Sequence, residues 1–302
     1  MIHNSSKHDP LSSEEQYLWL SKNANKKSRM EDQRNQIRNG KTVTEFIFGE
    51  ESTSFTKLVD PYHFSINPTE DIILFCNTND NLLQLYTLGG DFITTFTNQL
   101  LNSLIDVLFI KDAIYVTEDY SLEYFTDFAD KSVRFNTWID QMWSPLGLTC
   151  DSRENIYFID EFGHHIIVFE KDLNSFQEID VIPYTNCLVD IFVEYDELFL
   201  LSQSPRHIIK LSLEGEFIFR INCSNFLSFP ITFCPDGNGD ILISDSRSNN
   251  VLFVISTGNL QISLITLDRI LPKSEKFRNV AVVRNSSLIV SSLEYCYSLV
   301  LT

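Results

Sequence analysis

The chain has 302 residues, of which 43% are hydrophobic and 24 are phenylalanine, so it is long enough to bury a sizeable core. Its formal net charge of −18 at pH 7 disfavours nucleic acid and other polyanions as ligands. The sequence has no run of about 18 apolar residues. The opening residues MIHNSSKHDP also lack the apolar stretch of a secretory signal, so we expect a cytoplasmic protein without a membrane span.

Residues 1–40 differ in composition from the rest of the chain. They hold seven Lys or Arg and five Asp or Glu, a net charge of +2, which leaves −20 for residues 41–302. Ser12 followed by Glu15 fits a capping box at the start of a helix, but polar residues dominate after Leu20. We therefore predict a helical or flexible extension over residues 1–40, which as a helix would dock or self-associate, and a separate domain over residues 41–302.

A strand is predicted at Thr42–Phe48, which contains the tetrapeptide Glu-Phe-Ile-Phe that returns at Glu216–Phe219. The chain then repeats a unit of three short apolar runs separated by polar turns, which is typical of an antiparallel meander. The clearest copies are Pro145–Phe169, reading PLGLTCDSRENIYFIDEFGHHIIVF, and Pro230–Val254. A looser copy is Pro61–Tyr86.

The opening prolines of these copies are 84 and 85 residues apart, or two units each, close to the ~40–45 residues of a four-stranded propeller blade. The third residue of the opening strand in six successive units is His63, Asp106, Gly147, Asp190, Thr232 and Asn279. A fourth strand follows in the first five units, whereas the sixth ends at Thr302 without one. We therefore predict an all-β fold, a six-bladed β-propeller of four-stranded antiparallel blades whose last blade is closed by Thr42–Phe48.

The Pro-x-Gly-apolar start, the Asp-x-x-x-Asn turn and the Ile-Tyr-apolar-apolar-Asp strand of Pro145–Phe169 resemble the NHL repeat. Asp160 and the equivalent Asp245 end a strand before a turn, where they are expected to accept turn N–H bonds. The resemblance implies a six-bladed propeller that serves as a binding platform. NHL propellers also include RNA binders with a basic, aromatic-bearing face, and six-bladed relatives include metal-dependent lactonases and peptidyl-amidating lyases.

The resemblance to those enzymes is tested by the residues that would hold their metal. In the lactonases the ligands often follow the opening proline directly, and the residues at that place here are Tyr62, Ile105, Leu146, Val189, Ile231 and Arg278. None is a carboxylate or an amide. Amidating lyases use His, Tyr and Arg around zinc, and only Tyr62, His63 and Arg278 fit that scheme. A hydrolase or lyase that uses the central channel is therefore the first alternative, and RNA binding is the second.

The third residue of each opening strand, one after the position just discussed, is polar in most units. These side chains should converge at one mouth of the channel. The candidate ligand-binding residues are His63, Asp106, Asp190, Thr232 and Asn279, with Tyr62 and Arg278 beside them. They can bind a cation such as calcium or zinc, or a small polar ligand. The favoured reading is a polar lining of a wet channel without a cofactor. Two carboxylates that face a shared channel without a cation should repel, which raises at least one pKa. Replacing Asp106 and Asp190 by asparagine should then either stabilise the fold, if the site is empty, or abolish ion binding. A change in neither property is expected if the residues only line a wet channel.

The most economical function is non-catalytic. Six cysteines form no C-x-x-C pair and most lie in apolar runs, which indicates free thiols in a reducing compartment. No catalytic residue is assigned. We predict a binding platform that presents the loops of one propeller face to a protein or peptide partner.

We predict no measurable affinity of residues 41–302 for single-stranded RNA at about 0.15 M salt, because their net charge of −20 repels phosphates and salt screens long-range attraction. Fluorescence anisotropy with a labelled oligonucleotide checks this. Micromolar binding that weakens with added salt would show that the basic residues are gathered on one face.

Overall fold

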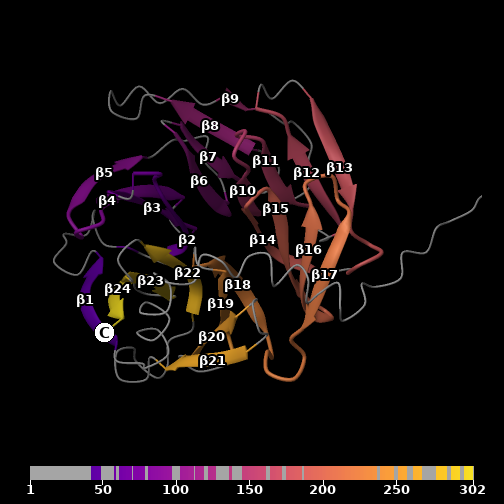
Figure 1. Ribbon diagram of the computed structural model, residues 1–302. Coiled ribbons are helices and arrows are strands. Elements are labelled where there is room, and N and C mark those ends of the chain that lie inside the picture. Colours follow the sequence, from indigo (N-terminus) through magenta and orange to yellow (C-terminus); the bar gives the residue numbers. More distant parts are fainter. Residues whose placement is uncertain are drawn as a thin grey trace, which may run out of the picture.

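Every element found in the described residues of the computed structural model is a β-strand, as the sequence predicts (Figure 1). The structure describes residues 42–301 with gaps at 49–57, 59–60, 70, 79–80, 97–102, 112, 119–121, 127–135, 138–144, 161–163, 172–174, 186, 237–238, 248–250, 257–260, 267–276, 284–286 and 293–295. The predicted extension over residues 1–40 lies outside this range. Within the described residues, no helix is long and apolar enough to cross a membrane.

The strands form six four-stranded antiparallel sheets, counted here in chain order from β2. The first three sheets comprise β2 (Pro61–Ile66), β3 (Ile72–Asn77), β4 (Leu82–Thr87) and β5 (Phe92–Phe96); β6 (Asp106–Ile110), β7 (Ala113–Thr117), β8 (Leu122–Thr126) and β9 (Asn136–Thr137); and β10 (Leu146–Cys150), β11 (Ile156–Ile159), β12 (His165–Phe169) and β13 (Phe176–Asp180). The last three comprise β14 (Leu188–Glu194), β15 (Glu197–Gln203), β16 (Arg206–Ser212) and β17 (Phe217–Asn222); β18 (Pro230–Pro235), β19 (Asp240–Asp245), β20 (Val251–Ser256) and β21 (Gln261–Thr266); and β22 (Phe277–Val283), β23 (Ser287–Ser292), β24 (Cys296–Leu301) and β1 (Thr42–Phe48).

The sheets stand around a common centre with their first strands innermost (Figure 1). Each first strand contacts the first strands of the sheets before and after it, and β22 contacts β2. The third and fourth strands lie progressively further out. We call the end of the sheets at which the first strands begin the start face.

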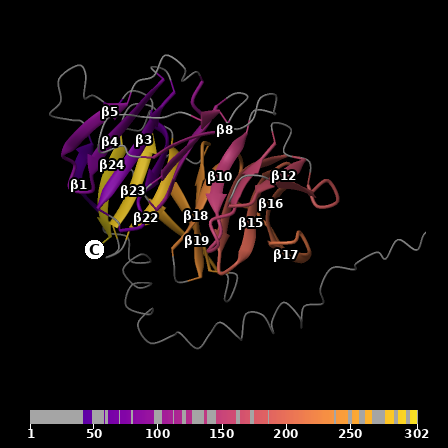
Figure 2. The same cartoon turned by 90° about the horizontal axis from the view of Figure 1, so that it is seen from above.

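The sixth sheet combines the two ends of the described chain. β1 pairs antiparallel with β24, from Thr42 opposite Leu301 to Phe48 opposite Cys296, with a register shift between Thr44 and Phe46. The view turned by 90° shows β1, β24, β23 and β22 as neighbours (Figure 2). The edge of β24 is thereby covered by a strand that precedes β2 in the chain.

Aspartates fix the turns between strands, as the sequence predicts. Asp160 Oδ1 accepts from the N–H groups of His164 and His165, at 2.6 and 2.9 Å. Asp245 accepts from Phe229 and Arg247, at 2.8 and 2.9 Å. These bonds satisfy backbone donors where the ladder ends, which is why Asp recurs at this place in the repeat.

The hydrophobic core lies between the sheets. Five clusters of buried side chains among the described residues each span two neighbouring sheets, including one that joins the first sheet to the sixth through Phe75 and Ile289. Strands such as β11, with all four residues buried, therefore read as continuous apolar runs. Packing between sheets gives the apolar stabilisation, while the inner edge of each sheet faces the common centre.

The pairing of β1 with β24 predicts different results for two truncations. Removing residues 1–40 should leave a cooperatively unfolding protein, whereas removing residues 1–50 also removes β1, uncovers the edge of β24 and favours aggregation. Thermal unfolding by circular dichroism and size-exclusion chromatography check this. Equal melting temperatures and equal monomer fractions for the two truncations would contradict it.

Candidate functional site

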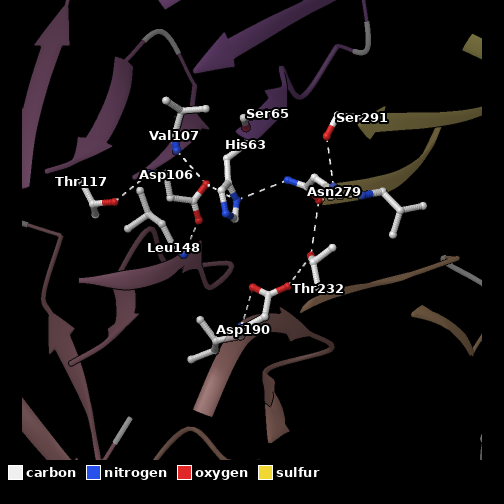
Figure 3. A network of polar contacts seen from close by, with 12 residues as sticks. His63, Ser65, Asp106, Val107, Thr117, Leu148, Asp190, Thr232, Asn279 and Ser291 are labelled. Carbon is white, nitrogen blue, oxygen red and sulfur yellow. Dashed lines mark hydrogen bonds and ion pairs between the residues drawn. The ribbon is translucent and has the colours of Figure 1, made fainter. Parts of the chain in front are cut away.

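The residues at the third position of the six predicted opening strands, here called the ring residues, lie at corresponding points of the first strands. His63, Asp106, Gly147, Asp190, Thr232 and Asn279 belong to β2, β6, β10, β14, β18 and β22 in turn, each near the strand start. Because neighbouring first strands contact one another, these residues come together around the centre (Figure 3). Arg278 precedes Asn279 and is half-buried. The side chain of Tyr62 lies outside the described part of the structure.

A register shift accompanies the ring position in five of these strands. The shifts fall between Pro61 and His63, Leu146 and Leu148, Leu188 and Asp190, Pro230 and Thr232, and Phe277 and Asn279. An extra residue at such a bulge re-aims the neighbouring side chain. In β10 the extra residue is Gly147, whose φ of +59° favours glycine. These bulges were not predicted from the sequence, and Gly147 is a signal for the one in β10 alone.

The ring side chains form a chain of polar contacts from sheet to sheet (Figure 3). His63 Nδ1 lies 3.1 Å from Asp106 Oδ1 and 3.3 Å from Asn279 Nδ2. Thr232 Oγ1 lies 2.5 Å from Asp190 Oδ2 and 3.4 Å from Asn279 Oδ1. A hydroxyl has one hydrogen, so the shorter contact takes it and Thr232 donates to Asp190. The chain of contacts therefore runs from Asp190 through Thr232, Asn279 and His63 to Asp106.

Asp106 binds the backbone of its own sheet and of the next one. Its Oδ1 accepts from the N–H of Val107 at 2.7 Å, and its Oδ2 accepts from the N–H of Leu148, in the third sheet, at 2.8 Å. Its own N–H donates to Thr117 Oγ1 at 3.0 Å. The Asp106 side chain thus links the second sheet to the third.

Asp190 repeats this arrangement two sheets further on. Its Oδ1 accepts from the N–H of Ile191 at 2.8 Å, and its Oδ2 accepts from the N–H of Phe233, in the fifth sheet, at 3.0 Å. Each of the four carboxylate oxygens of Asp106 and Asp190 therefore accepts a hydrogen bond from the backbone. The two residues that were predicted as ligand carboxylates serve as links between sheets.

Two hydroxyl groups further along the first strands extend the same pattern. Ser65 Oγ accepts from the N–H of Phe109 at 3.1 Å, which joins the first sheet to the second. Thr149 Oγ1 accepts from the N–H of Val193 at 3.2 Å, which joins the third to the fourth. With the carboxylates, a first-strand side chain binds the next backbone at four consecutive sheet boundaries. The sequence analysis missed both hydroxyls, although each is a polar residue two positions after the ring position in an apolar strand.

Gly147 stands where a side chain would crowd Asp190 and Ile191. A Cβ atom on Gly147 would lie 3.2 Å from Asp190 Oδ1 and 3.3 Å from the backbone nitrogen of Ile191. These atoms are held by the bond between them, so they cannot move apart cheaply. The glycine thus lets the third and fourth sheets approach closely at the centre.

The electrostatics of the ring follow from burial. Burial lowers the pKa of His63, but the charge and hydrogen bond of Asp106 and the charge of Asp190 outweigh it, so the pKa lies above its usual 6.5. Burial raises the pKa of Asp190 to about 6, against the lowering effects of Thr232, His63 and Phe233. Repulsion by Asp106 is the weakest cause in Asp190. The expected rise of one carboxyl pKa is confirmed, but desolvation rather than mutual repulsion is its main source.

The ring suits a cation poorly. Three or more His, Cys, Asp or Glu side chains arranged to hold a metal ion occur nowhere in the described residues. Each carboxylate oxygen of Asp106 and Asp190 accepts a backbone N–H, and Asp106 Oδ1 and Asp190 Oδ2 also contact His63 and Thr232, which leaves fewer lone pairs for calcium or zinc. The arrangement instead neutralises donors that would otherwise be buried without partners.

A second charged cluster, which the sequence analysis also missed, lies on the fourth sheet. The Lys210 side chain on β16 is 1% exposed, forms an ion pair with Glu197, and has its Nζ 4.8 Å from the centroid of the Phe199 ring. Burial lowers the pKa of Lys210 to about 8, against the raising effects of Glu197 and Glu194. This buried, paired lysine is enclosed by its own sheet, so it fixes packing rather than presenting a reactive amine.

Comparison with known proteins identifies the fold. No model of a known protein family matches the sequence, and no curated protein matches it. Solved structures are similar in fold. Streptogramin B lyase matches at a TM-score of 0.65 and 12% identity, over 88% of this chain and 99% of that one. A chain of the nidogen–laminin complex matches at 0.58 and 13% identity, over 70% and 80%. YCF48 bound to the D1 peptide matches at 0.58 and 9% identity, over 83% and 80%.

These structures are β-propellers, so the chain has a propeller fold built from antiparallel four-stranded sheets. At these identities the likeness concerns the fold alone. The NHL resemblance stays a prediction, as does the assignment of a ligand to the ring.

The geometry changes the expected effect of neutralising the ring. An asparagine at position 190 would place its NH₂ group against a backbone N–H, because both carboxylate oxygens accept from the backbone. We therefore predict that Asp190→Asn lowers the free energy of unfolding at pH 7 by on the order of 1–3 kcal/mol. From the sequence, the double substitution of Asp106 and Asp190 was expected to stabilise an empty site, or to change nothing if the residues only line a wet channel. Urea denaturation measures this.

The control is Glu178→Gln on the exposed strand β13, which should change the free energy of unfolding by less than about 0.5 kcal/mol.

The difference in free energy of unfolding between the wild type and Asp190→Asn should also grow as the pH falls. The folded pKa of Asp190, about 6, exceeds the ordinary 3.8, so the wild type gains stability as the pH falls through 6 towards 3.8 and the variant lacks this gain. Stabilisation by Asp190→Asn at pH 7 would show that charge repulsion dominates the ring.

Proposed function

We propose that the chain is a six-bladed, NHL-type β-propeller over residues 41–302, closed by the pairing of β1 with β24, which acts as a non-catalytic binding module for a protein or peptide. Six four-stranded sheets with mutually contacting first strands support the blade number. The register between β1 and β24 supports the closure. The six cysteines are free thiols, which supports the proposed cytoplasmic location.

One observation carries the non-catalytic assignment. All four carboxylate oxygens of Asp106 and Asp190 are bound by backbone N–H groups, in each case partly from the next sheet. A general base or a metal ligand has to offer a lone pair to the substrate or to the ion. Asp106 Oδ1 and Asp190 Oδ2 each have a second contact, with His63 and with Thr232, so these two carboxylates have fewer lone pairs left for that task. The loops of the two faces then remain as the surfaces on which function is to be sought.

The structural neighbours show what propellers of this shape do elsewhere. The nidogen–laminin and YCF48–D1 peptide structures are complexes with a protein and with a peptide. Since one fold hosts many functions, this likeness raises the plausibility of binding without fixing the partner.

The alternative is a lyase or hydrolase that uses His63 as its acid or base. The contact of His63 Nδ1 with Asp106 at 3.1 Å favours it, because such a pair orients an imidazole in many active sites. Streptogramin B lyase among the neighbours is an enzyme of this fold. Against it, the same Nδ1 atom also faces Asn279, in line with the other links between sheets.

A partner-retention experiment distinguishes the two functions. Full-length protein and its His63→Gln variant are purified from expressing cells after mild cross-linking, and bound protein and metal content are quantified. A binding module predicts a stoichiometric partner that both forms retain, provided that the melting temperature of the variant shows an intact fold. Absence of a stoichiometric partner from both forms would favour the enzyme, and metal that is bound by the wild type and lost in His63→Gln would show that this enzyme uses a metal at the ring.

A further inference from the structure

An exposed aromatic residue is held rigidly on the start face. Phe229 lies in the loop before β18 and is 40% exposed. Its N–H donates to Asp245 Oδ2 at 2.8 Å, and its carbonyl oxygen accepts from the N–H of Ser246 at 3.0 Å. The N–H of Ser228 donates to the same carboxylate oxygen at 2.5 Å. The loop is therefore ordered before any partner arrives, which reduces the entropy lost on binding.

One arginine stacks on this ring, and a second binds the backbone of its loop. The Arg247 guanidinium carbon lies 5.4 Å from the centroid of the Phe229 ring, within the range of a cation–π contact. Arg206 Nη1 donates to the carbonyl oxygen of Ser228 at 3.4 Å. The one carboxylate that contacts this loop in the described residues, that of Asp245, is 1% exposed and bound to backbone N–H groups through both oxygens. The accessible charge here is therefore positive, on a chain whose net charge is −18.

We propose that Arg206, Phe229 and Arg247, here called the Phe229 patch, form the docking site for a peptide segment in which an Asp or Glu stands beside an apolar side chain. This inference rests on the proposed binding function and names its surface. A guanidinium group binds a carboxylate with two parallel hydrogen bonds, and the open face of Phe229 takes up the apolar side chain. Aromatic residues and arginines dominate binding energy at interfaces, particularly where they are fixed in advance.

Charge complementarity selects this occupant over nucleic acid. An acidic segment is attracted to the Phe229 patch while the remainder of the protein repels anions, which limits binding to short stretches of negative charge. A continuous phosphate backbone would extend beyond the patch along a protein whose net charge is −18, which costs binding energy. We therefore expect the patch to bind an acidic peptide and not RNA, and the experiment below measures both.

The test selects ligands for the full-length protein from a phage-displayed random peptide library and measures the selected peptides, amidated at the C-terminus, by fluorescence anisotropy. Enrichment of Asp or Glu beside an apolar residue is expected, with affinity that falls as salt is added. Phe229→Ala and Arg247→Glu should each weaken binding by on the order of tenfold or more. Both side chains are exposed, so the variants should fold.

Two controls match these changes elsewhere on the surface. Phe176→Ala removes a phenylalanine that is 51% exposed on β13, and Arg153→Glu reverses a charge that is 63% exposed in the turn after β10, at the opposite end of the first strands. Neither should change the affinity by more than about twofold, as expected for residues outside the contact.

The outcomes separate this inference from the function on which it rests. Peptides that bind equally well to the wild type and to both patch variants would overturn the Phe229 patch and leave the binding module intact. Failure to select any peptide, with single-stranded RNA bound by the wild type and lost in Arg247→Glu, would reassign the patch to nucleic acid. Failure of both probes would overturn the patch and weaken the binding proposal itself.

Discussion

The structure depends on hydrogen bonds that cross from the first strand of one sheet to the backbone of the next. Each sheet satisfies its ladder within itself, but the inner edge of a first strand leaves N–H groups that face the centre, where burial without a partner would cost 1–3 kcal/mol each. Asp106 and Asp190 supply the missing acceptors for Leu148 and Phe233. Apolar packing holds the faces of neighbouring sheets together, and these bonds fix their positions relative to one another at the centre.

This role explains the electrostatics of the ring. The N–H bonds offset only part of the cost of burying these carboxylates, since the pKa of Asp190 is still raised to about 6. Asp106 has His63, whose pKa is raised, at 3.1 Å. His63 stabilises the folded state below its ordinary pKa of 6.5, and this contribution is lost as the pH rises through its higher folded value. The raised pKa of Asp190 acts in the same direction, so its contribution to the free energy of unfolding grows as the pH falls from about 6 to 3.8.

Much of the architecture was readable from the sequence because it is repeated. The spacing of Pro61, Pro145 and Pro230 gave the period, and alternating apolar runs gave the strands. The ring position was also predictable, since one place in a repeat maps to one place around an axis. The hydrogen bonds of the ring residues could not be predicted, because a repeat period indicates which residues lie close together but not which backbone N–H donates to each side-chain oxygen.

Features that break the repeat were beyond the sequence analysis. A bulge shifts the register by one residue without a fixed residue signature, so the re-aiming of His63 and Asp190 could not be foreseen. The hydrogen bond of Thr149 to the backbone of the next sheet could not be predicted, because Thr149 is a single polar residue within an apolar strand. The exposure of Phe229 depends on how Asp245, 16 residues later, holds the loop. Each of these depends on contacts between residues of different strands.

The central claim is that the ring side chains are links between sheets, and native-state hydrogen exchange at the amides of Leu148 and Phe233 tests it most directly. These N–H groups donate to side chains of the preceding sheet, at 2.8 and 3.0 Å. The account predicts that both exchange only through global unfolding, as slowly as the amide of the fully buried Ile243. Exchange that is orders of magnitude faster at Leu148 and Phe233 than at Ile243 would contradict it.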